Sequence, residues 1–336
     1  MLHEKDTWYL LLYDAHSPKL LGIGECSPID GLSVDKVTGI EPVLDKICND
    51  ITRYQKHYRQ VHDTFPCIQF GLEAALLDAR SARDGILYPS DFTKGTEGIP
   101  INGLIWMGDP QFMQAQIDAK LAGGNSCLKL KIGSLDFPAE CEILRRLRAR
   151  YNRHDLELRV DANGAFRPEE ALQKLQKLAT FHLHSIEQPI WPRQWETMRL
   201  LCEKSPVPIA LDEELIGVSD PEKRNLLSCL RPQYIILKPS LLGGFARTQQ
   251  WIDVAAEMQT DWWVTSALES NIGLNAIAQW VANMEIRRPQ GLGTGQIYRN
   301  NISSPLFLKN DMLWFDDSTS WDYANLRFSD TLQARQ

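Results

Sequence analysis

Three acidic residues, Asp161, Glu187 and Asp212, each end a short apolar stretch that is typical of a β-strand. If three neighbouring strands carry them, their carboxylates converge, and like charges brought together need a cation. Oxygen ligands that leave room for water and substrate favour Mg²⁺. Taken singly, each acid could be a helix cap or a surface charge. Their shared position at strand ends is what favours a metal site.

Two lysines, Lys129 and Lys131, stand two residues apart on one predicted strand and therefore point to the same face. Like-charge repulsion and partial burial would lower a lysine pKa toward the range of a general base. An edge strand with solvated lysines is the alternative. The apolar residues Leu128, Leu130 and Ile132 on the opposite face favour an internal strand instead.

A third lysine, Lys238, ends a strand four units after that of Lys131. Four is half of the eight units in a closed barrel, so the two lysines would face each other across the metal. By itself Lys238 could be a solvated strand-end charge. A metal that holds a carboxylate, with an amine or ammonium on each side, suits removal of a proton from the adjacent carbon. We expect proton abstraction alpha to a carboxylate.

The spacing of these residues indicates how the elements that carry them are arranged. Successive separations are 30, 26, 25, 26 and 28 residues along the series Lys131, Asp161, Glu187, Asp212, Lys238 and Ser266. Each step is the length of one strand and one helix, and eight such units close a barrel whose active site lies at the strand ends. A doubly wound open sheet is the competing architecture, but the glycine fingerprint expected after its first strand is absent.

Hydrophobic patterning predicts alternating strands and helices from residue 99 onward. The predicted strands are Ile99–Ile105, Cys127–Ile132, Leu156–Asp161, His184–Glu187, Pro208–Asp212, Tyr234–Lys238 and Trp262–Ser266, with Gly291–Gly295 as a possible eighth. The predicted helices are Met113–Ala122, Pro138–Tyr151, Pro168–Ala179, Arg247–Met258 and Gly273–Met284.

The first hundred residues follow a different pattern, which predicts an α+β unit. Two short apolar stretches, Trp8–Tyr13 and Lys19–Cys26, flank a turn-rich segment and suit a hairpin. Apolar residues then recur at helical spacing over Ser33–Tyr58 and Ile68–Arg83.

Composition excludes several classes of protein. The 336 residues are 43% apolar and carry a net charge of −7 without a basic stripe, so nucleic acid is not an expected partner. The longest apolar run, Trp8–Tyr13, is far too short to span a membrane. Seven scattered cysteines without a C-x-x-C pair indicate reduced thiols and a cytoplasmic protein. No H-E-x-x-H is present, so any metal must be sought among carboxylates.

Taken in order, these segments resemble the enolase superfamily and, within it, the muconate-lactonizing subgroup. The segments that carry the resemblance are Lys129–Lys131, Asp161–Gly164, Ile186–Pro189, Leu211–Glu213, Leu237–Ser240 and Ser266–Ser270. The stretch Gly291–Gly295, together with the run Ser266–Gly273, is most similar to the branch that forms 2-succinylbenzoate for menaquinone biosynthesis.

The resemblance implies a fold and its domains. The fold would be an α/β (β/α)7β TIM-type barrel with an N-terminal α+β capping domain. The capping domain would span residues 1–98, the catalytic barrel 99–300, and residues 301–336 would pack back on the capping domain. Members of the family have a further strand and a mobile lid loop before the segment that corresponds to Leu2–Trp8. Both would precede Met1, so the expectation is a start codon placed too late, a truncated chain or a real absence of the strand and lid.

The resemblance also implies roles for the charged residues. Asp161, Glu187 and Asp212 would bind Mg²⁺, for which Mn²⁺ can substitute. Lys131 would be the base, Lys129 its modulator and Lys238 the cation that stabilises an enediolate. The substrate would be a small carboxylate, 2-succinyl-6-hydroxy-2,4-cyclohexadiene-1-carboxylate, which loses water by syn elimination.

Five further residues are weaker candidates. Ser266 and Gly293 would contact the succinyl arm of the substrate. The alternative is that they are an ordinary turn serine and turn glycine. Arg159 would support the metal site from one layer below, or be a paired arginine of the barrel interior. Asn163 would bond a metal ligand or turn the chain. Glu213 would pair with Lys131 or Lys129.

Two other functions remain open. A dipeptide epimerase or an N-succinylamino acid racemase of the same subgroup would use the same metal and the same two lysines. By resemblance, dipeptide epimerases carry an acidic D-x-D pair near the eighth strand, where this chain has Gly293–Gly295. A barrel that binds without catalysis is the more distant alternative.

Overall fold

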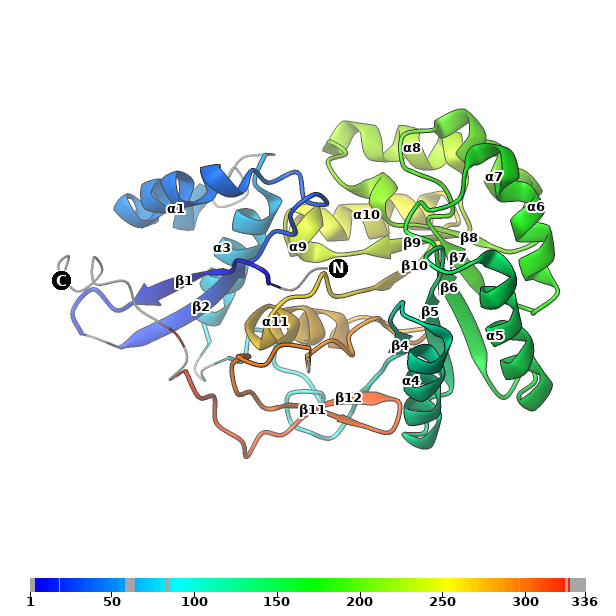
Figure 1. Ribbon diagram of the computed structural model, residues 1–336. Coiled ribbons are helices and arrows are strands. Elements are labelled where there is room, and N and C mark those ends of the chain that lie inside the picture. The colour runs from blue at the N-terminus through cyan, green and yellow to red at the C-terminus, as the bar shows by residue number, and fades with distance from the viewer. Residues whose placement is uncertain are drawn as a thin grey trace.

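A seven-stranded parallel sheet forms the centre of the molecule. The computed structural model describes residues 4–17, 19–57, 64–81, 85–295, 297–323 and 326. The sheet has the order β10-β9-β8-β7-β6-β5-β4, so strands that are consecutive in the chain lie side by side (Figure 1). Its strands are β4 (Gly103–Ile105), β5 (Cys127–Lys131), β6 (Glu157–Asp161), β7 (Ser185–Glu187), β8 (Ile209–Leu211), β9 (Tyr234–Leu237) and β10 (Asp261–Val264).

The helices form the outer layer, and the apolar residues that alternate along the strands, such as Leu128, Leu130 and Val160, pack with them in one hydrophobic core. The longer helices are α4 (Pro110–Ala122), α5 (Phe137–Arg150), α6 (Pro168–Ala179), α7 (Trp195–Lys204), α8 (Lys223–Leu230), α10 (Phe245–Glu257) and α11 (Asn271–Ala282). Short turns are η3 (Glu213–Leu215), η4 (Asp220–Glu222) and α9 (Pro239–Leu242).

Local sequence signals explain where several helices begin. Asp109 caps α4 by accepting the Gln111 and Phe112 N–H groups, both at 2.9 Å, and proline follows at the first helical position. The predicted helix Pro168–Ala179 is confirmed as α6. The sequence analysis did not predict α7 and α8.

Two predicted strands need correction. Ile99–Ile105 is divided into β3 (Ile99–Pro100), which pairs with β12 (Met312–Phe315), and β4 in the parallel sheet. The division arises because the Ile101 N–H donates to Asp311 O, whereas the next N–H donates to Gln290 O, both at 2.9 Å. The possible eighth strand, Gly291–Gly295, forms only an isolated bridge at Gly291. Alternate glycines there offer no side chains to pack on a pleated surface.

The N-terminal region consists of a β-hairpin followed by helices. Strands β1 (Trp8–Tyr13) and β2 (Leu20–Cys26) are antiparallel, with Trp8 opposite Cys26. A Cβ at Gly24 would lie 1.7 Å from the carbonyl oxygen of Gly71, so only glycine allows β2 to approach helix α3 this closely. The helices are η1 (Val37–Gly39), α1 (Ile40–Asn49), α2 (Ile51–His57) and α3 (Pro66–Asp78). The single predicted helix Ser33–Tyr58 is therefore wrong in its start and its continuity.

The C-terminal segment forms a second antiparallel hairpin and a small core. Strands β11 (Leu306–Lys309) and β12 (Met312–Phe315) pair with each other, and β12 also pairs with β3. Beyond them, Trp321, Tyr323 and Leu326 pack against Ile23 of β2 and its neighbours.

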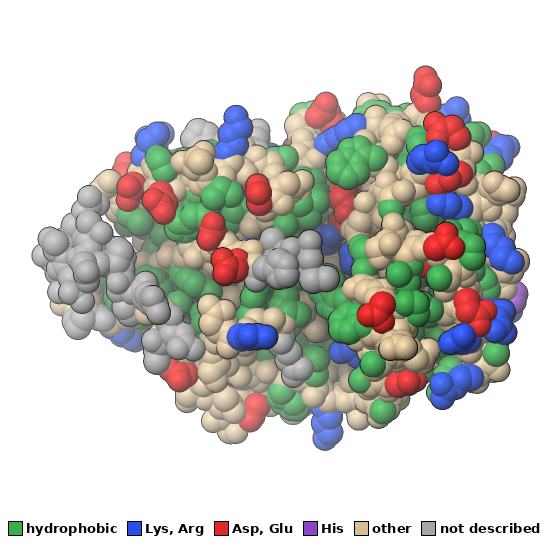
Figure 2. Space-filling view, viewed as in Figure 1, with side chains coloured by type: hydrophobic (Ala, Val, Ile, Leu, Met, Phe, Trp, Pro, Cys, Tyr) green, Lys and Arg blue, Asp and Glu red, His purple; other side chains and the backbone are tan. Residues whose placement is uncertain are grey.

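The surface carries mixed charge. Figure 2 shows acidic and basic side chains interspersed on the visible face, without a continuous basic stripe. In the described ranges, no helix is both long and apolar enough to cross a membrane.

We expect the stability of the protein to depend on the buried carboxyl of Asp35. This carboxyl accepts the Cys67 N–H at 3.1 Å in the first turn of α3, and burial raises its pKa from 3.8 to about 6. An acid whose folded pKa is raised stabilises the fold most below its unfolded pKa, and this stabilisation is lost as pH rises through the folded value. The shift corresponds to roughly 3 kcal/mol at most.

The test compares thermal unfolding of Asp35→Asn and the wild type between about pH 4 and about pH 7. The variant should gain stability relative to the wild type as pH rises, because asparagine keeps the acceptor and carries no charge. The control Asp30→Asn removes an exposed acid from the same loop and should show no such trend. Parallel pH profiles for Asp35→Asn and the wild type would refute the prediction.

Candidate active site

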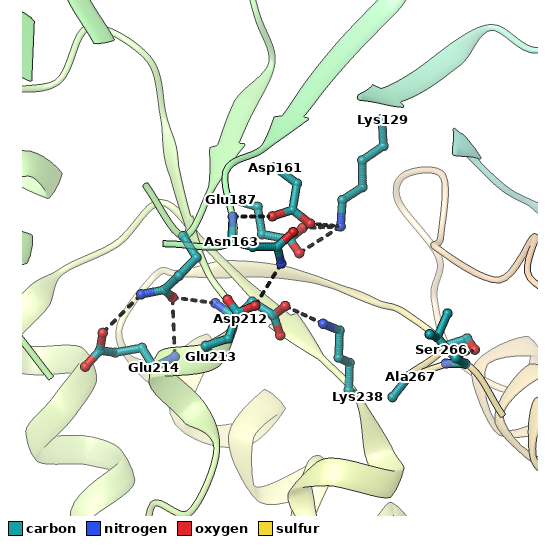
Figure 3. Close-up of polar contacts among 12 residues, drawn as sticks. Lys129, Asp161, Asn163, Glu187, Asp212, Glu213, Glu214, Lys238, Ser266 and Ala267 are labelled. Carbon is teal, nitrogen blue, oxygen red and sulfur yellow. Dashed lines mark hydrogen bonds and ion pairs between the residues drawn. The ribbon is translucent and has the colours of Figure 1, made fainter. Parts of the chain in front are cut away.

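The three acidic residues lie together at the C-terminal ends of adjacent strands (Figure 3). Asp161 ends β6, Glu187 ends β7, and Asp212 directly follows β8. Asp161 stands opposite Glu187 in the register, whereas Glu187 stands opposite Ala210, so Asp212 lies two residues farther toward the mouth. All three are buried, with at most 2% of their surface exposed. The parallel register is what brings these side chains to one rim.

The lysines of β5 reach the same carboxylates. β5 lies between β4 and β6, which confirms the predicted internal strand. Lys129 Nζ donates to both oxygens of Glu187, at 2.7 and 2.6 Å, and lies 2.9 Å from Asp161 Oδ2. Lys131 Nζ donates to Asp161 Oδ2 at 2.6 Å and to Asn163 Oδ1 at 2.7 Å. The side chain of Lys131 is 14% exposed and that of Lys129 is 5% exposed, so Lys131 is the more accessible.

The third lysine approaches from the other side of the acids. Lys238 directly follows β9, and its ammonium forms a salt bridge with Asp212 Oδ2. In Figure 3, Lys129 and Lys238 extend toward the acids from different strands. The alternative of a solvated lysine is excluded for Lys238, because it is only 8% exposed.

The expectation that paired lysines have lowered pKa values is wrong for Lys129. Burial by itself lowers its pKa, but the Asp161 and Glu187 carboxylates outweigh burial and hold the pKa above its ordinary value. Lys238 behaves in the same way: burial lowers its pKa, whereas Asp212 and other acids raise it further. The reason is that each ammonium lies in direct contact with a carboxylate, whose attraction exceeds the repulsion between lysines.

The surroundings shift the pKa values of the three acids in different directions. Burial, and next the charge of Asp161, raise the pKa of Glu187 to about 8. Burial and the adjacent Glu213 raise the pKa of Asp212. Burial acts to raise the pKa of Asp161 too, but Lys129 and Lys131 outweigh it and hold that pKa well below its usual value. The cluster would therefore gain from a further cation.

The donor set fits Mg²⁺. Within the described residues, no three acidic, histidine or cysteine side chains are arranged closely enough to hold a metal ion. The ammonium groups of Lys129, Lys131 and Lys238 lie against the acids instead. The acids offer oxygen atoms only, and burial and the neighbouring charge of Asp161 disfavour the charged form of Glu187, which a bound cation would favour. Mg²⁺ prefers such ligands, and it would compete with the ammonium groups for them.

Asn163 and Glu213 extend this network. The Asn163 N–H donates to Asp161 Oδ1 at 3.0 Å, and its side-chain amide donates to Glu213 Oε1 at 2.8 Å. Asn163 has a φ of 43°, so it also turns the chain before Gly164. The expected pairing of Glu213 with a β5 lysine is wrong, because Lys129 and Lys131 contact Asp161 and Glu187, whereas Glu213 accepts the Asn163 side-chain amide.

Arg159 is a buried arginine with partners of its own. Its Nε donates to Glu157 at 2.7 Å, one Nη donates to Pro289 O at 2.9 Å, and its guanidinium lies 4.3 Å from the ring centroid of Trp263. These contacts involve none of the three acids. These hydrogen bonds of Arg159 therefore give no support to a role at the proposed metal site.

The two candidates for the succinyl arm lie outside the acid cluster. Ser266 Oγ donates to Glu269 at 2.6 Å and accepts the Leu268 N–H at 3.1 Å. A Cβ at Gly293 would lie 3.2 Å from Ile101 Cδ1, so glycine leaves room for this segment to lie close to Ile101, between β3 and β4. Contact of either residue with substrate stays a prediction.

Sequence reasoning missed Gln188, which organises two loops. This fully buried side chain accepts the N–H groups of Asp212 and Glu214, at 3.2 and 3.3 Å. It also donates to Ile190 O at 3.1 Å and to Glu214 at 3.2 Å. The available signal was a polar amide directly after Glu187 in a segment that was expected to be buried.

Comparisons with known proteins find relatives that match most of this chain. The enolase C-terminal domain-like family matches residues 113–313. The o-succinylbenzoate synthase of Desulfotalea psychrophila is 47% identical, over 93% of this chain and 93% of the relative. The crystal structure of MenC from Desulfotalea psychrophila LSv54 has a TM-score of 0.81 at 45% identity, and the match covers 92% of this chain and 94% of that one.

More distant proteins share the fold. The L-Ala-D/L-Glu epimerase from Bacillus subtilis, solved with substrate, has a TM-score of 0.78 at 17% identity, covering 93% of this chain and 89% of that one. The dipeptide epimerase from Cytophaga hutchinsonii, complexed with Mg and a dipeptide, has a TM-score of 0.77 at 18% identity, covering 95% and 89%. These likenesses concern architecture alone.

Proposed function

We propose a reaction for this site from the premise that the chain belongs to the enolase C-terminal domain-like family and, within it, to the o-succinylbenzoate synthases. The reaction is loss of water from 2-succinyl-6-hydroxy-2,4-cyclohexadiene-1-carboxylate to give 2-succinylbenzoate, a step of menaquinone biosynthesis. The observation that carries this proposal is that lysines from β5 and from the end of β9 approach one buried acid cluster from different sides.

The first half of the proposed reaction is proton removal. Lys131, as the neutral amine, takes the proton from the ring carbon that bears the carboxylate. Lys131 suits this role because it is more exposed than Lys129, and its hydrogen bonds to Asp161 and Asn163 hold Nζ at the edge of the cluster. Lys238 remains charged and stabilises the enediolate left by proton removal, and its raised pKa supports this role.

The second half is loss of hydroxide as water. The Lys131 ammonium formed in the first half gives its proton to the leaving hydroxyl on the same face of the ring. The enediolate electron pair then forms the last double bond, the ring becomes aromatic, and Lys131 returns to the amine. Lys129, whose ammonium lies against Asp161 and Glu187, modulates the charge around Lys131 without exchanging a proton.

Asp161, Glu187 and Asp212 are the proposed ligands of Mg²⁺, with Mn²⁺ as a substitute. Bound there, the ion would attract the charge that develops on the substrate carboxylate. Asn163, and through it Glu213, would hold Asp161 in orientation, and Gln188 would hold the backbone of Asp212.

We also infer that the parallel sheet closes into a (β/α)7β barrel. Hydrogen bonds from Asn102 N to Gln290 O and from Gly291 N to Val264 O, at 2.9 and 2.8 Å, support closure between β4 and β10. Residues 1–98 would form the capping domain, 99–300 the barrel, and 301–336 the segment that packs on the cap. The scattered cysteines, without a C-x-x-C pair, support a reducing, cytoplasmic compartment.

An ultraviolet assay of aromatisation tests the proposed reaction directly. Purified protein is mixed with synthetic substrate, with and without Mg²⁺, and formation of 2-succinylbenzoate is followed. Magnesium-dependent product formation is expected. Absence of product in the presence of Mg²⁺, from a folded protein, would contradict the proposal.

An epimerase or racemase of the same subgroup is the second candidate, because the same two lysines could exchange an alpha proton from either face. Incubation with N-succinylamino acids or with dipeptides in deuterated water distinguishes the candidates. Deuterium at the alpha carbon without any dehydration of the cyclohexadiene would favour this second function.

A further inference from the structure

The loop after β10, residues Ser266–Ser270, is held from within by a buried carboxylate. Glu269, which has no exposed surface, accepts the Ser266 hydroxyl at 2.6 Å and the Ala267 N–H at 2.8 Å. It also accepts the hydroxyl of Ser240, in the turn after β9. One carboxylate therefore joins the ends of two strands.

A second buried carboxylate holds the other end of this loop, and it comes from the N-terminal region. Glu25 of β2 accepts the Ser270 N–H at 2.8 Å, the Ser270 hydroxyl at 2.6 Å and the Gly273 N–H at 2.8 Å. Its side chain also has no exposed surface. Because these donors lie at the N-terminus of α11, Glu25 fixes both the end of the loop and the start of the helix.

The N-terminal region makes a further contact with the same loop. Lys5 Nζ donates to the carbonyl oxygens of Ala267 and Leu268, at 3.1 and 2.7 Å. Leu268 has a φ of 61°, a left-handed conformation that a leucine adopts only where its surroundings hold it. The loop is thus kept in an uncommon conformation by side chains more than 240 residues away in sequence.

This loop borders the acid cluster on the side of Lys238. β10 pairs with β9 up to Val264 and Leu237, and the next N–H, of Thr265, donates to Leu237 O at 2.9 Å. Ser266 therefore lies one residue beyond the level of Lys238, and Figure 3 shows Ser266 and Ala267 on that side of the acids. A substrate held between Lys131 and Lys238 would meet this loop.

We propose that Glu25 is a positioning residue, by which the N-terminal region sets the conformation of the Ser266–Ser270 loop for the substrate arm. This inference rests on the proposed function. Because the hydroxyl of Ser266 and the N–H of Ala267 already donate to Glu269, the loop serves as a preordered wall. Substrate binding then avoids the entropy cost of ordering the loop, so loss of Glu25 weakens binding more than chemistry.

The test uses Glu25→Gln with Glu73→Gln as a matched control. Glu73 of α3 is also buried and accepts the Phe245 N–H, at 2.7 Å, at the start of α10, but it does not contact the loop. Glutamine at position 25 keeps the size of the side chain but places an amide donor against existing donors. We expect Glu25→Gln to raise KM about tenfold with kcat within about threefold, and Glu73→Gln to leave KM within about twofold.

Amide hydrogen exchange gives a readout that is independent of turnover. Exchange over residues 266–273 should be faster in Glu25→Gln than in the wild type and in Glu73→Gln. An unchanged KM, an equal rise of KM in Glu73→Gln, or unchanged exchange would each overturn the proposal. If Glu25→Gln does not fold, Ser270→Ala, which removes the hydroxyl bonded to Glu25, should show the same effects to a smaller extent, and its failure to do so would overturn the proposal.

The two proposals fail in different ways. A wild-type protein that forms no 2-succinylbenzoate refutes the proposed reaction, whatever the exchange data show. A wild-type protein that is active, beside a Glu25→Gln variant with normal KM and normal exchange, refutes the positioning role alone.

Discussion

Replacing Lys131 by alanine should abolish dehydration while Mg²⁺ affinity and thermal stability stay nearly unchanged. Loss of a general base typically costs about 10² to 10⁴ in rate. Here the same group also returns the proton to the leaving hydroxyl, so we expect the upper part of that range or more. The fold should tolerate the change, because Asp161 keeps Lys129 as a partner at 2.9 Å.

Lys131→Arg separates chemistry from charge. Arginine keeps a positive charge beside Asp161 but stays protonated at neutral pH, so it cannot accept the substrate proton. Both variants should therefore be inactive, as measured by the ultraviolet assay, with metal binding followed by calorimetry. Substantial turnover by Lys131→Arg would remove Lys131 from the role of base, and a large loss of Mg²⁺ affinity in Lys131→Ala would point to a structural role instead.

Removal of the metal should silence the enzyme reversibly. Chelation is expected to abolish activity, and either Mg²⁺ or Mn²⁺ should restore it. Burial, and next the charge of Asp161, raise the pKa of Glu187 to about 8, so a divalent cation bound beside these acids would favour their charged forms. Recovery with Zn²⁺ alone, or an enzyme indifferent to chelators, would be incompatible with the proposed carboxylate ligands.

Glu187→Gln tests the ligand set at a single residue. The substitution keeps the size of the side chain but removes one of three anionic ligands, so Mg²⁺ affinity should fall by about 10² or more. Calorimetric titration measures this loss, and excess Mg²⁺ should restore part of the activity. Glu203→Gln, a change at an exposed residue of α7, is the control and should bind Mg²⁺ like the wild type.

Much of the candidate site could be predicted from the sequence because parallel strands impose a simple geometry. Side chains alternate along each strand, and the strand ends share one rim, so residues at intervals of one strand and one helix come together. Asp161, Glu187 and Asp212 meet for this reason, and so do Lys129 and Lys131. The family comparison then supports the reaction, since 47% identity extends over nearly the whole chain.

Other features could not be read from local pattern because they depend on partners that are distant in sequence. The division of Ile99–Ile105 depends on β12, which lies some 200 residues later. The raised pKa of Lys129 depends on its distance from two carboxylates and on burial, neither of which residue spacing specifies.

The contacts around the loop after β10 show most clearly that local sequence pattern does not reveal partners that are distant in sequence. The strand pattern placed Ser266 close to the end of a strand, which the structure ends at Val264. Local pattern gave no sign that Glu25 and Lys5 hold the loop that follows, through contacts spanning more than 240 residues. Alternation along a strand fixes the face of the sheet to which a side chain points and its position along the strand. Its partner depends instead on how elements that are distant in the sequence pack together.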